Sequence, residues 1–345
     1  MINAIAIHDE LSNHSSQSVH EMPDTLMKAC YLCGVDAYLF ELEEICTYKR
    51  EGYINAYRWT PKGYTACVTD MPKYSVYNFV VGVKSKVKSY YQWLVENTIM
   101  LNTAGIRKDL LQKKMLSTDL ANYAIPSFVT RSYWETVDML SLIPKAIIKP
   151  LGGSMGRGIL KVNKNENGLY CQTPEGEYLF TESVFSAFES ESGFQTNPQM
   201  LLEPCLNILT DDGRAVDLRC QTSLDRTGKW KNVLTYARIG ASDVVSNISH
   251  GGSVTFAYEI LEAFAPGHGK ELLEEANWAA RRTSEIVEEL SGGAINCLGV
   301  DICYDRDSAR LYVIEANAGP GFKIVGPWPL ALARAEYFKY RLSQE

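Results

Sequence analysis

The 345-residue sequence lacks both a long apolar run and a positive net charge. No apolar stretch reaches the roughly 18 to 20 residues that a membrane-spanning helix needs, so no membrane partner is expected. The net charge of −7 gives no electrostatic basis for nucleic acid as the main partner. The segment from Met1 to His8 lacks a basic region and a cleavage site, and it predicts a buried strand rather than a signal peptide.

The sequence also lacks the cysteine pattern of a disulfide framework. Its nine cysteines are odd in number, and several lie in apolar, strand-like runs, which favours a reduced, cytoplasmic setting. Cys30 and Cys33 form a CxxC motif, but two further zinc ligands at a suitable spacing are missing nearby. The motif therefore predicts one face of a helix near Pro23–Cys33 that ends at Gly34.

The length predicts two or three domains, and the apolar patterns place their boundaries. Residues 1–105 alternate strand and helix, with strands at Ala4–His8 and Ala37–Glu41, which indicates an open α/β domain. Residues 106–203 and 204–345 combine helices with runs of strands, which indicates two α+β subdomains. The predicted fold class is therefore α/β together with α+β.

A lysine and a cluster of glycines follow one another near the middle of the chain. Lys149 ends an apolar strand, and four glycines and a serine lie within the seven residues from Gly152 to Gly158. Glycines let backbone N–H groups approach an anion, and Lys149 and Arg157 add positive charge. No Gly-Lys-Ser/Thr opens a helix, and a strand follows the glycines, which excludes a Walker loop and a dinucleotide fingerprint. The pattern predicts a flap over phosphates, with a plain turn as the alternative.

A second cluster is acidic and lies on a predicted hairpin of two strands, Gly299–Cys303 and Arg310–Glu315. Asp301 stands in an otherwise apolar strand, while Glu315 and Asn317 are two residues apart and share one face. Oxygen ligands from adjacent strands suit Mg²⁺, which also takes ligands from substrate phosphates. The alternative is a solvated hairpin end followed by a turn.

The order of these motifs resembles that of the ATP-grasp superfamily. The Lys-Pro-glycine loop is followed by Asp-x-Arg at Asp217–Arg219, by Asn…Gly-Gly at 247–252, and by Asp…Glu-x-Asn-x-x-Pro-Gly at 301–321. Tyr236-Ala-Arg238 and Val245–Gly252 are similar to the RimK-like and YheC/YheD-like branch. The resemblance covers about residues 100 to 325, and it implies two subdomains that clamp ATP, behind an N-terminal domain.

The resemblance implies that two lysines contact ATP. Lys149 would contact the α- and β-phosphates. The second lysine of the family lies before the proline that ends the preceding helical segment. Counting back from Pro126 favours Lys113, with Lys108 and Lys114 as the alternatives.

The resemblance also implies the other nucleotide contacts. The glycine loop would fold over the phosphates through Gly153, Ser154 and Gly156. The hinge between the subdomains would bind adenine, which points to Glu203 and Leu206; Pro204 departs from the usual residue there and removes a backbone donor. Asp211 and Asp212 are alternatives for the ribose contact.

Catalytic and metal roles follow by the same resemblance. Arg219 and Arg238 would lie near the reacting carboxylate, with surface salt bridges as the alternative, and Asn247 would lie beside the γ-phosphate. His250 is a candidate for proton transfer. The metal ion, Mg²⁺ with Mn²⁺ as an alternative, would be held by Asp301, Glu315 and Asn317.

The implied activity is ADP-forming ligation of a carboxylate to an amine through an acylphosphate. The partners would be small-molecule carboxylate and amine substrates, of amino-acid or peptide type, with a homodimer as a candidate assembly. Two alternatives stay open: an ATP-grasp kinase or cyclase with another acceptor, and a non-catalytic ATP-binding protein. The segments Asp9–Met22, Tyr48–Tyr64 and Glu182–Pro198 are predicted as variable loops that shape the substrate pocket.

Overall fold

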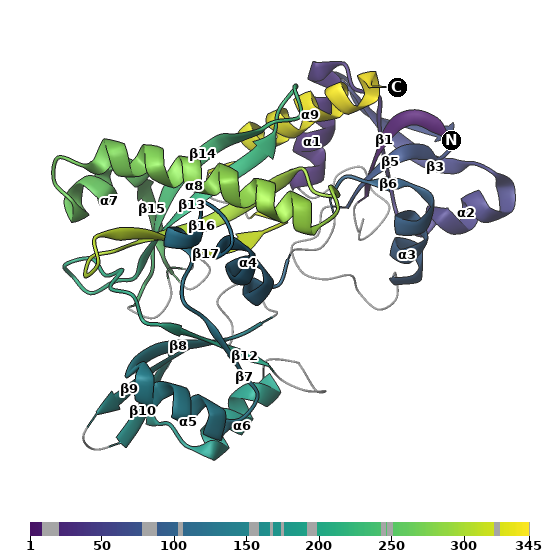
Figure 1. The fold of residues 1–345 in the computed structure, drawn as a ribbon. Coiled ribbons are helices and arrows are strands. Elements are labelled where there is room, and N and C mark those ends of the chain that lie inside the picture. Colours follow the sequence, from purple (N-terminus) through teal and green to yellow (C-terminus); the bar gives the residue numbers. More distant parts are fainter. Residues whose placement is uncertain are drawn as a thin grey trace.

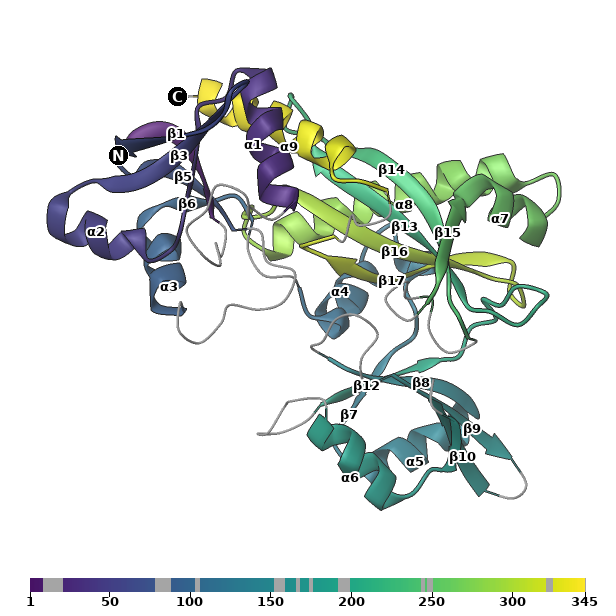
Figure 2. The ribbon, with the colours of Figure 1, turned by 180° about the vertical axis from the view of Figure 1, so that it is seen from behind.

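The chain folds around three β-sheets, and residues 1–204 build the first two of them. A computed structural model describes residues 1–8, 21–77, 88–102, 106–151, 159–165, 168–173, 176–191, 199–242, 246, 251–320 and 325–344. The mixed α/β architecture confirms the predicted fold class. Figure 1 shows the second sheet in a lobe that projects from the rest of the molecule, and Figure 2 shows the same lobe from behind.

The first sheet has the strand order β4-β3-β2-β1-β5-β6. The strands β1, β2, β5 and β6 pair in parallel, whereas β3 and β4 form an antiparallel hairpin at the edge. Helices α1, α2 and α3 belong to this part of the chain. The bounds are β1 Ile2–His8, α1 Glu21–Cys33, β2 Ala37–Phe40, α2 Glu44–Glu51, β3 Ile54–Thr60, β4 Gly63–Thr69, β5 Pro72–Tyr77, α3 Lys88–Asn97 and β6 Ile99–Met100.

The second sheet is antiparallel throughout, in the order β11-β10-β9-β8-β12-β7. Helix α5 begins at the N-cap residue Ser132, whose side chain accepts from the backbone N–H of Glu135 at 3.2 Å. Apolar residues of α5 and α6 cover one face of the sheet. The bounds are β7 Phe128–Thr130, α5 Tyr133–Leu142, β8 Lys145–Pro150, β9 Leu160–Asn165, β10 Gly168–Thr173, β11 Gly176–Leu179, α6 Glu182–Glu191 and β12 Met200–Pro204.

The third sheet is also antiparallel, in the order β15-β14-β13-β16-β17. Helix α8 covers its apolar face, while α9 packs against α1 and against β13 and β14, so it joins the third sheet to the first domain. The bounds are β13 Val216–Leu224, β14 Trp230–Ile239, β15 Ser253–Phe256, α7 Ala257–Phe264, α8 Gly269–Leu290, β16 Cys297–Asp305, β17 Arg310–Asn317 and α9 Trp328–Ser343.

Two predicted loops contain regular structure. The stretch from Tyr48 to Tyr64 holds the end of α2 and the hairpin of β3 and β4, and Glu182–Glu191 is helix α6. In the hairpin, the Trp59 ring lies 5.1 Å from that of Tyr31 on α1, so this aromatic residue supports the fold of the first domain.

The cysteines and the helices agree with two further expectations. All nine cysteines are free, and Cys30 and Cys33 lie on α1, which confirms the predicted helix. Among the described residues, no helix combines the length and the apolar character needed to cross a membrane.

Candidate functional site

The third sheet presents its acidic residues on one face because of a β-bulge. The register pairs Asp301 with Glu315 but Ile302 with Val313, so Ile314 is the extra residue. Without this bulge, Glu315 would share the face of Val313, which is fully buried in the apolar core. The bulge therefore lets the apolar part of β17 face the core while Glu315 and Asn317 face the site, beside Asp301.

Asp301 is almost fully buried and is held by two arginines. Arg219 donates to it from Nε and, at 3.0 Å, from Nη2, and Nη2 of Arg238 lies 2.9 Å from its Oδ2. Burial raises the pKa of Asp301, against the opposite effect of the two guanidinium groups. Because both arginines donate to this carboxylate, we infer that it is ionised at neutral pH.

The network extends from Arg238 to a second buried carboxylate. Arg238 donates from Nε to Oδ1 of Asp217 at 2.7 Å, and Asp217 also accepts from the Ser246 hydroxyl at 2.6 Å. Burial would lower the pKa of Arg238, but the charges of Asp217 and Asp301 outweigh it and raise this pKa well above its usual value. The guanidinium group is therefore a permanent cation within the site.

Close approach of Arg219 to β16 requires a glycine at position 299. A Cβ atom there would lie 2.8 Å from Cβ of Pro320 and 3.0 Å from Cδ of Arg219. Gly299 thus leaves room for the Arg219 side chain to reach Asp301 across the sheet. Gly299 is not among the residues predicted for the site, although a glycine two residues before Asp301 in a buried strand is a signal of such an approach.

Glu315 is surrounded by cationic and amide groups. Nζ of Lys108 lies 3.3 Å from Oε2 of Glu315, and Asn317 donates from Nδ2 to Glu315 at 2.9 Å and to Asp301 at 3.3 Å. Burial would raise the pKa of Glu315, but Lys108, the Asn317 hydrogen bond, and the charges of Lys149 and Arg219 outweigh it and lower the pKa to about 2. The carboxylate is therefore ionised at any physiological pH.

The second sheet contributes one buried ion pair on the face opposite to α5 and α6. Nζ of Lys149 on β8 lies 2.6 Å from Oε2 of Glu203 on β12, and both side chains are nearly inaccessible. The other oxygen of Glu203, Oε1, is buried and accepts no hydrogen bond from the described residues. An unpartnered buried carboxylate oxygen is costly, so it marks a place where a ligand donor fits.

The ion pair of the second sheet lies near enough to the acidic face of the third for their charges to interact. The charge of Lys149 contributes to the low pKa of Glu315 on the third sheet. Burial raises the pKa of Cys303, and the neighbouring charges that act on this thiol include Asp217 and Glu203, one from each sheet. Cys303 is a further residue on the site face that the sequence analysis did not assign to it.

The three candidate lysines for the second ATP contact have different surroundings. Lys108, at the start of α4 (Lys108–Met115), reaches Glu315, whereas Lys113 is exposed on the same helix and Lys114 pairs with Glu289 at 2.7 Å. The buried Gln112 fixes this helix, because it donates to the carbonyl of Val313 on β17 at 2.8 Å. The geometry therefore favours Lys108 as the lysine that faces the site.

Three further predicted nucleotide contacts lie on the connection between the second and third sheets. Leu206 follows β12 on the connection to the third sheet, where its carbonyl accepts from the N–H of Ile208 at 3.1 Å. The two candidates for ribose, Asp211 and Asp212, pair with Arg306 and Arg214. The remaining candidates lie outside the described residues: Gly153, Ser154, Gly156, Asn247 and His250.

The donor set of the acidic face fits a hard divalent cation. Within the described part of the chain, no three His, Cys, Asp or Glu side chains form a metal-binding group, so the set is two carboxylates and the Asn317 amide. Carboxylate and amide oxygens are ligands of the kind Mg²⁺ takes, and the Asn317 amide, whose nitrogen faces the carboxylates here, would supply its oxygen when turned. A set this small leaves the remaining coordination to phosphate oxygens and water.

Comparison with known sequences identifies a family. The model of the family described as YheC/D like ATP-grasp matches residues 97–336. Over 196 residues, the chain is 26% identical to the endospore coat-associated protein YheD of Bacillus subtilis strain 168, which covers 55% of this chain and 43% of the relative. The chain thus matches less than half of the length of that protein.

Comparison with solved structures shows the fold. D-cycloserine synthetase DcsG aligns with a TM-score of 0.56 and 12% identity over 99% of both chains. The D-alanine-D-alanine ligase from Coxiella burnetii aligns with a TM-score of 0.51 and 12% identity over 99% of this chain and 95% of its own. The biotin carboxylase domain of the Hydrogenobacter thermophilus 2-oxoglutarate carboxylase was solved with MgADP and bicarbonate. It aligns with a TM-score of 0.57 and 12% identity over 99% of this chain and 70% of its own. With the family model matching more than half of its length, the chain belongs to the YheC/D-like ATP-grasp family.

Proposed function

We propose that this protein is an ATP-dependent, ADP-forming ligase that joins a carboxylate to an amine. The observation that carries the proposal is the pair of facing charged surfaces. Lys149 and Glu203 come from one sheet, and the network around Asp301 and Glu315 comes from the other. Phosphoryl transfer depends mainly on positioning and on neutralising charge, which this arrangement supplies.

The nucleotide would bind between the two sheets. Lys149 is proposed to contact phosphate oxygens, and Oε1 of Glu203, which accepts no hydrogen bond from the described residues, is proposed to accept from the amino group of adenine, next to the hinge at Leu206. Lys108 is proposed to contact the phosphates from the side of the third sheet, which its position beside Glu315 supports. The Gly153, Ser154 and Gly156 loop is proposed to cover the phosphates and exclude water from a reactive intermediate.

The metal site is proposed at Asp301, Glu315 and Asn317, with Mg²⁺ or Mn²⁺. When bound there, the ion would neutralise the phosphate oxygens of the nucleotide. The protein residues would have a separate task. Arg219 and Arg238 hold Asp301, so the position of this carboxylate is fixed before any ion binds.

The reaction is proposed to run in two steps. A carboxylate oxygen of the first substrate attacks the γ-phosphorus, the bond to the β–γ bridging oxygen breaks, and ADP leaves. The amine of the second substrate then attacks the acyl carbon, and phosphate leaves with the bonding electrons as the amine loses a proton. Arg238 is a candidate to stabilise the oxyanion of the second step, and Asn247 is proposed beside the γ-phosphate.

The experiment is ADP release by the purified protein with Mg²⁺ against a panel of amino acids and dipeptides. Substrate-dependent ADP together with a new amide product is the expected result, and an Asp301→Asn variant serves as the inactive control. ADP release that needs a hydroxyl acceptor would favour a kinase instead. Nucleotide binding without ADP release under any mixture would favour a non-catalytic role, to which the name of the coat-associated relative gives some support.

A further inference from the structure

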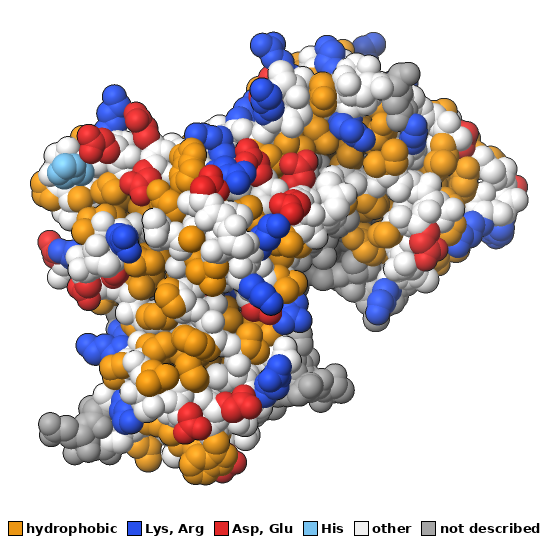
Figure 3. All heavy atoms as spheres, viewed as in Figure 1, with side chains coloured by type: hydrophobic (Ala, Val, Ile, Leu, Met, Phe, Trp, Pro, Cys, Tyr) orange, Lys and Arg blue, Asp and Glu red, His pale blue; other side chains and the backbone are white. Residues whose placement is uncertain are grey.

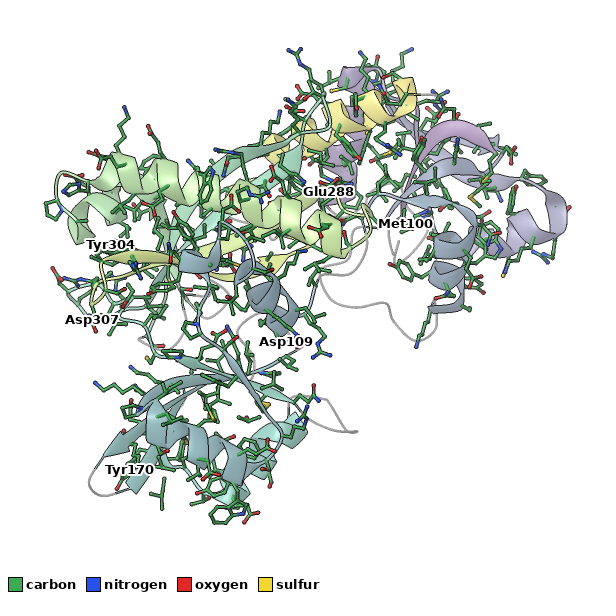
Figure 4. All side chains as sticks on the ribbon, viewed as in Figure 1. Met100, Asp109, Tyr170, Glu288, Tyr304 and Asp307 are labelled. Atoms are coloured by element: carbon green, nitrogen blue, oxygen red, sulfur yellow. The ribbon has the colours of Figure 1, made fainter. Side chains whose placement is uncertain are left out.

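The segment between the two sheets is fastened at both ends. It runs from Cys205 to Asp211, between β12 and β13, and we call it the hinge. On the side of the second sheet, the Cys205 N–H donates to the carbonyl of Lys145 at 3.0 Å. On the side of the third sheet, the turn between β16 and β17 holds the next residues, and Figure 4 labels Asp307 on this turn.

Asp305 makes the central contact between this turn and the hinge. Its Oδ1 accepts from the backbone N–H of Asn207 at 2.7 Å, while Oδ2 accepts from the N–H and the hydroxyl of Ser308 at 3.1 and 2.6 Å. The side chain is only 5% exposed. One buried carboxylate therefore fixes both the hairpin turn and the residue that directly follows Leu206.

Further contacts come from the same turn. Arg306 donates its N–H to the carbonyl of Asn207 at 2.9 Å and its Nη1 to the carbonyl of Leu209 at 2.9 Å. The Asn207 side chain donates to Asp307 at 2.7 Å. Three backbone groups of the hinge, the N–H and carbonyl of Asn207 and the carbonyl of Leu209, are thus hydrogen-bonded to one hairpin. This part of the hinge therefore has little freedom to move independently of the hairpin.

We propose that Asp305 is a positioning residue for the adenine end of the nucleotide site; this rests on the proposed function. The same strand, β16, carries Asp301 four residues earlier, so it spans on the order of 13 Å between the metal ligand and the hinge contact. The hairpin therefore sets the distance between the two ends of the nucleotide site. Loss of the Asp305 contact would loosen the base-binding end and leave the phosphate-binding end in place.

Two ligands allow the base-binding end and the phosphate-binding end to be tested separately. ADP with Mg²⁺ uses both the base-binding and the phosphate-binding ends, whereas inorganic tripolyphosphate with Mg²⁺ uses only the second. Isothermal titration of wild type and Asp305→Ala with each ligand is expected to show an about tenfold weaker Kd for ADP, with the Kd for tripolyphosphate changed less than about twofold. Equal weakening for both ligands, or no weakening for ADP, would overturn the proposal.

A matched control is available at the opposite end of the sheet. Asp225 accepts from the N–H groups of Thr227 and Lys229 at 2.7 and 3.1 Å in the turn between β13 and β14. Asp225→Ala removes a turn carboxylate of the same kind, and its Kd for ADP is expected to stay within twofold of wild type. Should Asp305→Ala fail to fold, Asp305→Asn, which keeps one acceptor oxygen, replaces it. Its Kd for ADP is again expected to weaken more than its Kd for tripolyphosphate. Wild type that binds neither ligand would sink the proposed function itself, a different result from a failure of the Asp305 proposal.

Discussion

The two sheets that face each other across the site balance their buried charges in different ways. On the second sheet, Lys149 pairs with Glu203, and one oxygen of Glu203 accepts no hydrogen bond from the described residues. On the third sheet, three carboxylates and three cations are linked in a continuous network: Asp217, Asp301 and Glu315 with Lys108, Arg219 and Arg238.

This difference suggests different tasks for the two sheets: the ion pair of the second sheet can accept a new hydrogen bond from a ligand, whereas the network of the third sheet holds its charged groups in fixed positions. A pair with a spare acceptor can take a new donor without breaking a contact, which suits the recognition of a nucleotide base. A network whose members satisfy one another is rigid, because displacing one group leaves another buried charge unpaired. The third sheet therefore fixes the geometry of the site. Figure 3 shows a recess between the lower lobe, which carries the second sheet, and the first domain at the upper right.

The largest expected effect comes from removing the centre of the network. Asp301→Ala leaves Arg219 and Arg238 buried without their shared acceptor, so we expect a loss of about 3–5 kcal/mol in the free energy of unfolding and no ADP formation. Urea denaturation measures the first and a coupled ADP assay the second. The control is Asp119→Ala, which removes a surface partner of Arg282 and should cost less than about 1 kcal/mol. Equal costs for the two variants would show that the network does not stabilise the fold.

The next largest effect is a fall in the free energy of unfolding at acidic pH. The pKa of Glu315 falls from 4.5 to about 2 on folding, so its ionised form stabilises the protein above pH 4.5, and this stabilisation is lost as the pH falls toward 2. We expect wild type to lose up to about 3 kcal/mol more than Glu315→Gln over this interval. Denaturation curves at a series of pH values measure it, and identical slopes for both proteins would contradict the assignment.

A smaller effect distinguishes two lysines of one helix. Lys108→Met removes the cation beside Glu315 and should raise KM for ATP about tenfold, which corresponds to about 1.4 kcal/mol. Lys113→Met alters an exposed side chain of α4 and should change KM less than twofold. The reverse order would restore Lys113 as the ATP lysine.

The smallest effect on stability is expected where both members of a pair are replaced. Lys149→Met together with Glu203→Leu substitutes apolar groups of similar size for a buried ion pair, and such exchanges are often neutral. We expect the free energy of unfolding to stay within about 1 kcal/mol of wild type, while ADP binding is lost. Lys149→Met alone leaves Glu203 charged and buried, so it should be clearly less stable than the double variant. A double variant as unstable as the single would mean that this pair, too, is part of a network.

The sequence predicted the fold class and several elements that surround the site. The strands predicted at Ala4–His8 and Ala37–Glu41 are found as β1 and β2, and the predicted hairpin around Asp301 is found as β16 and β17. Counting back from Pro126 favours Lys113, whereas in the structure it is Lys108 that reaches Glu315. The reason is that residues 121–123 form a short 3₁₀ turn after α4, which changes the number of residues between helix and proline.

The sequence by itself determined which chemical groups the protein carries: a strand-end lysine, two arginines, and an Asp, Glu and Asn on a predicted hairpin. Only the tertiary structure decided which of these groups meet. The bulge at Ile314 turns Glu315 to the face of Asp301, and Gly299 admits Arg219 to that carboxylate. Such pairings depend on strand register and on space between atoms far apart in the chain, and neither is written in the spacing of residues along one strand.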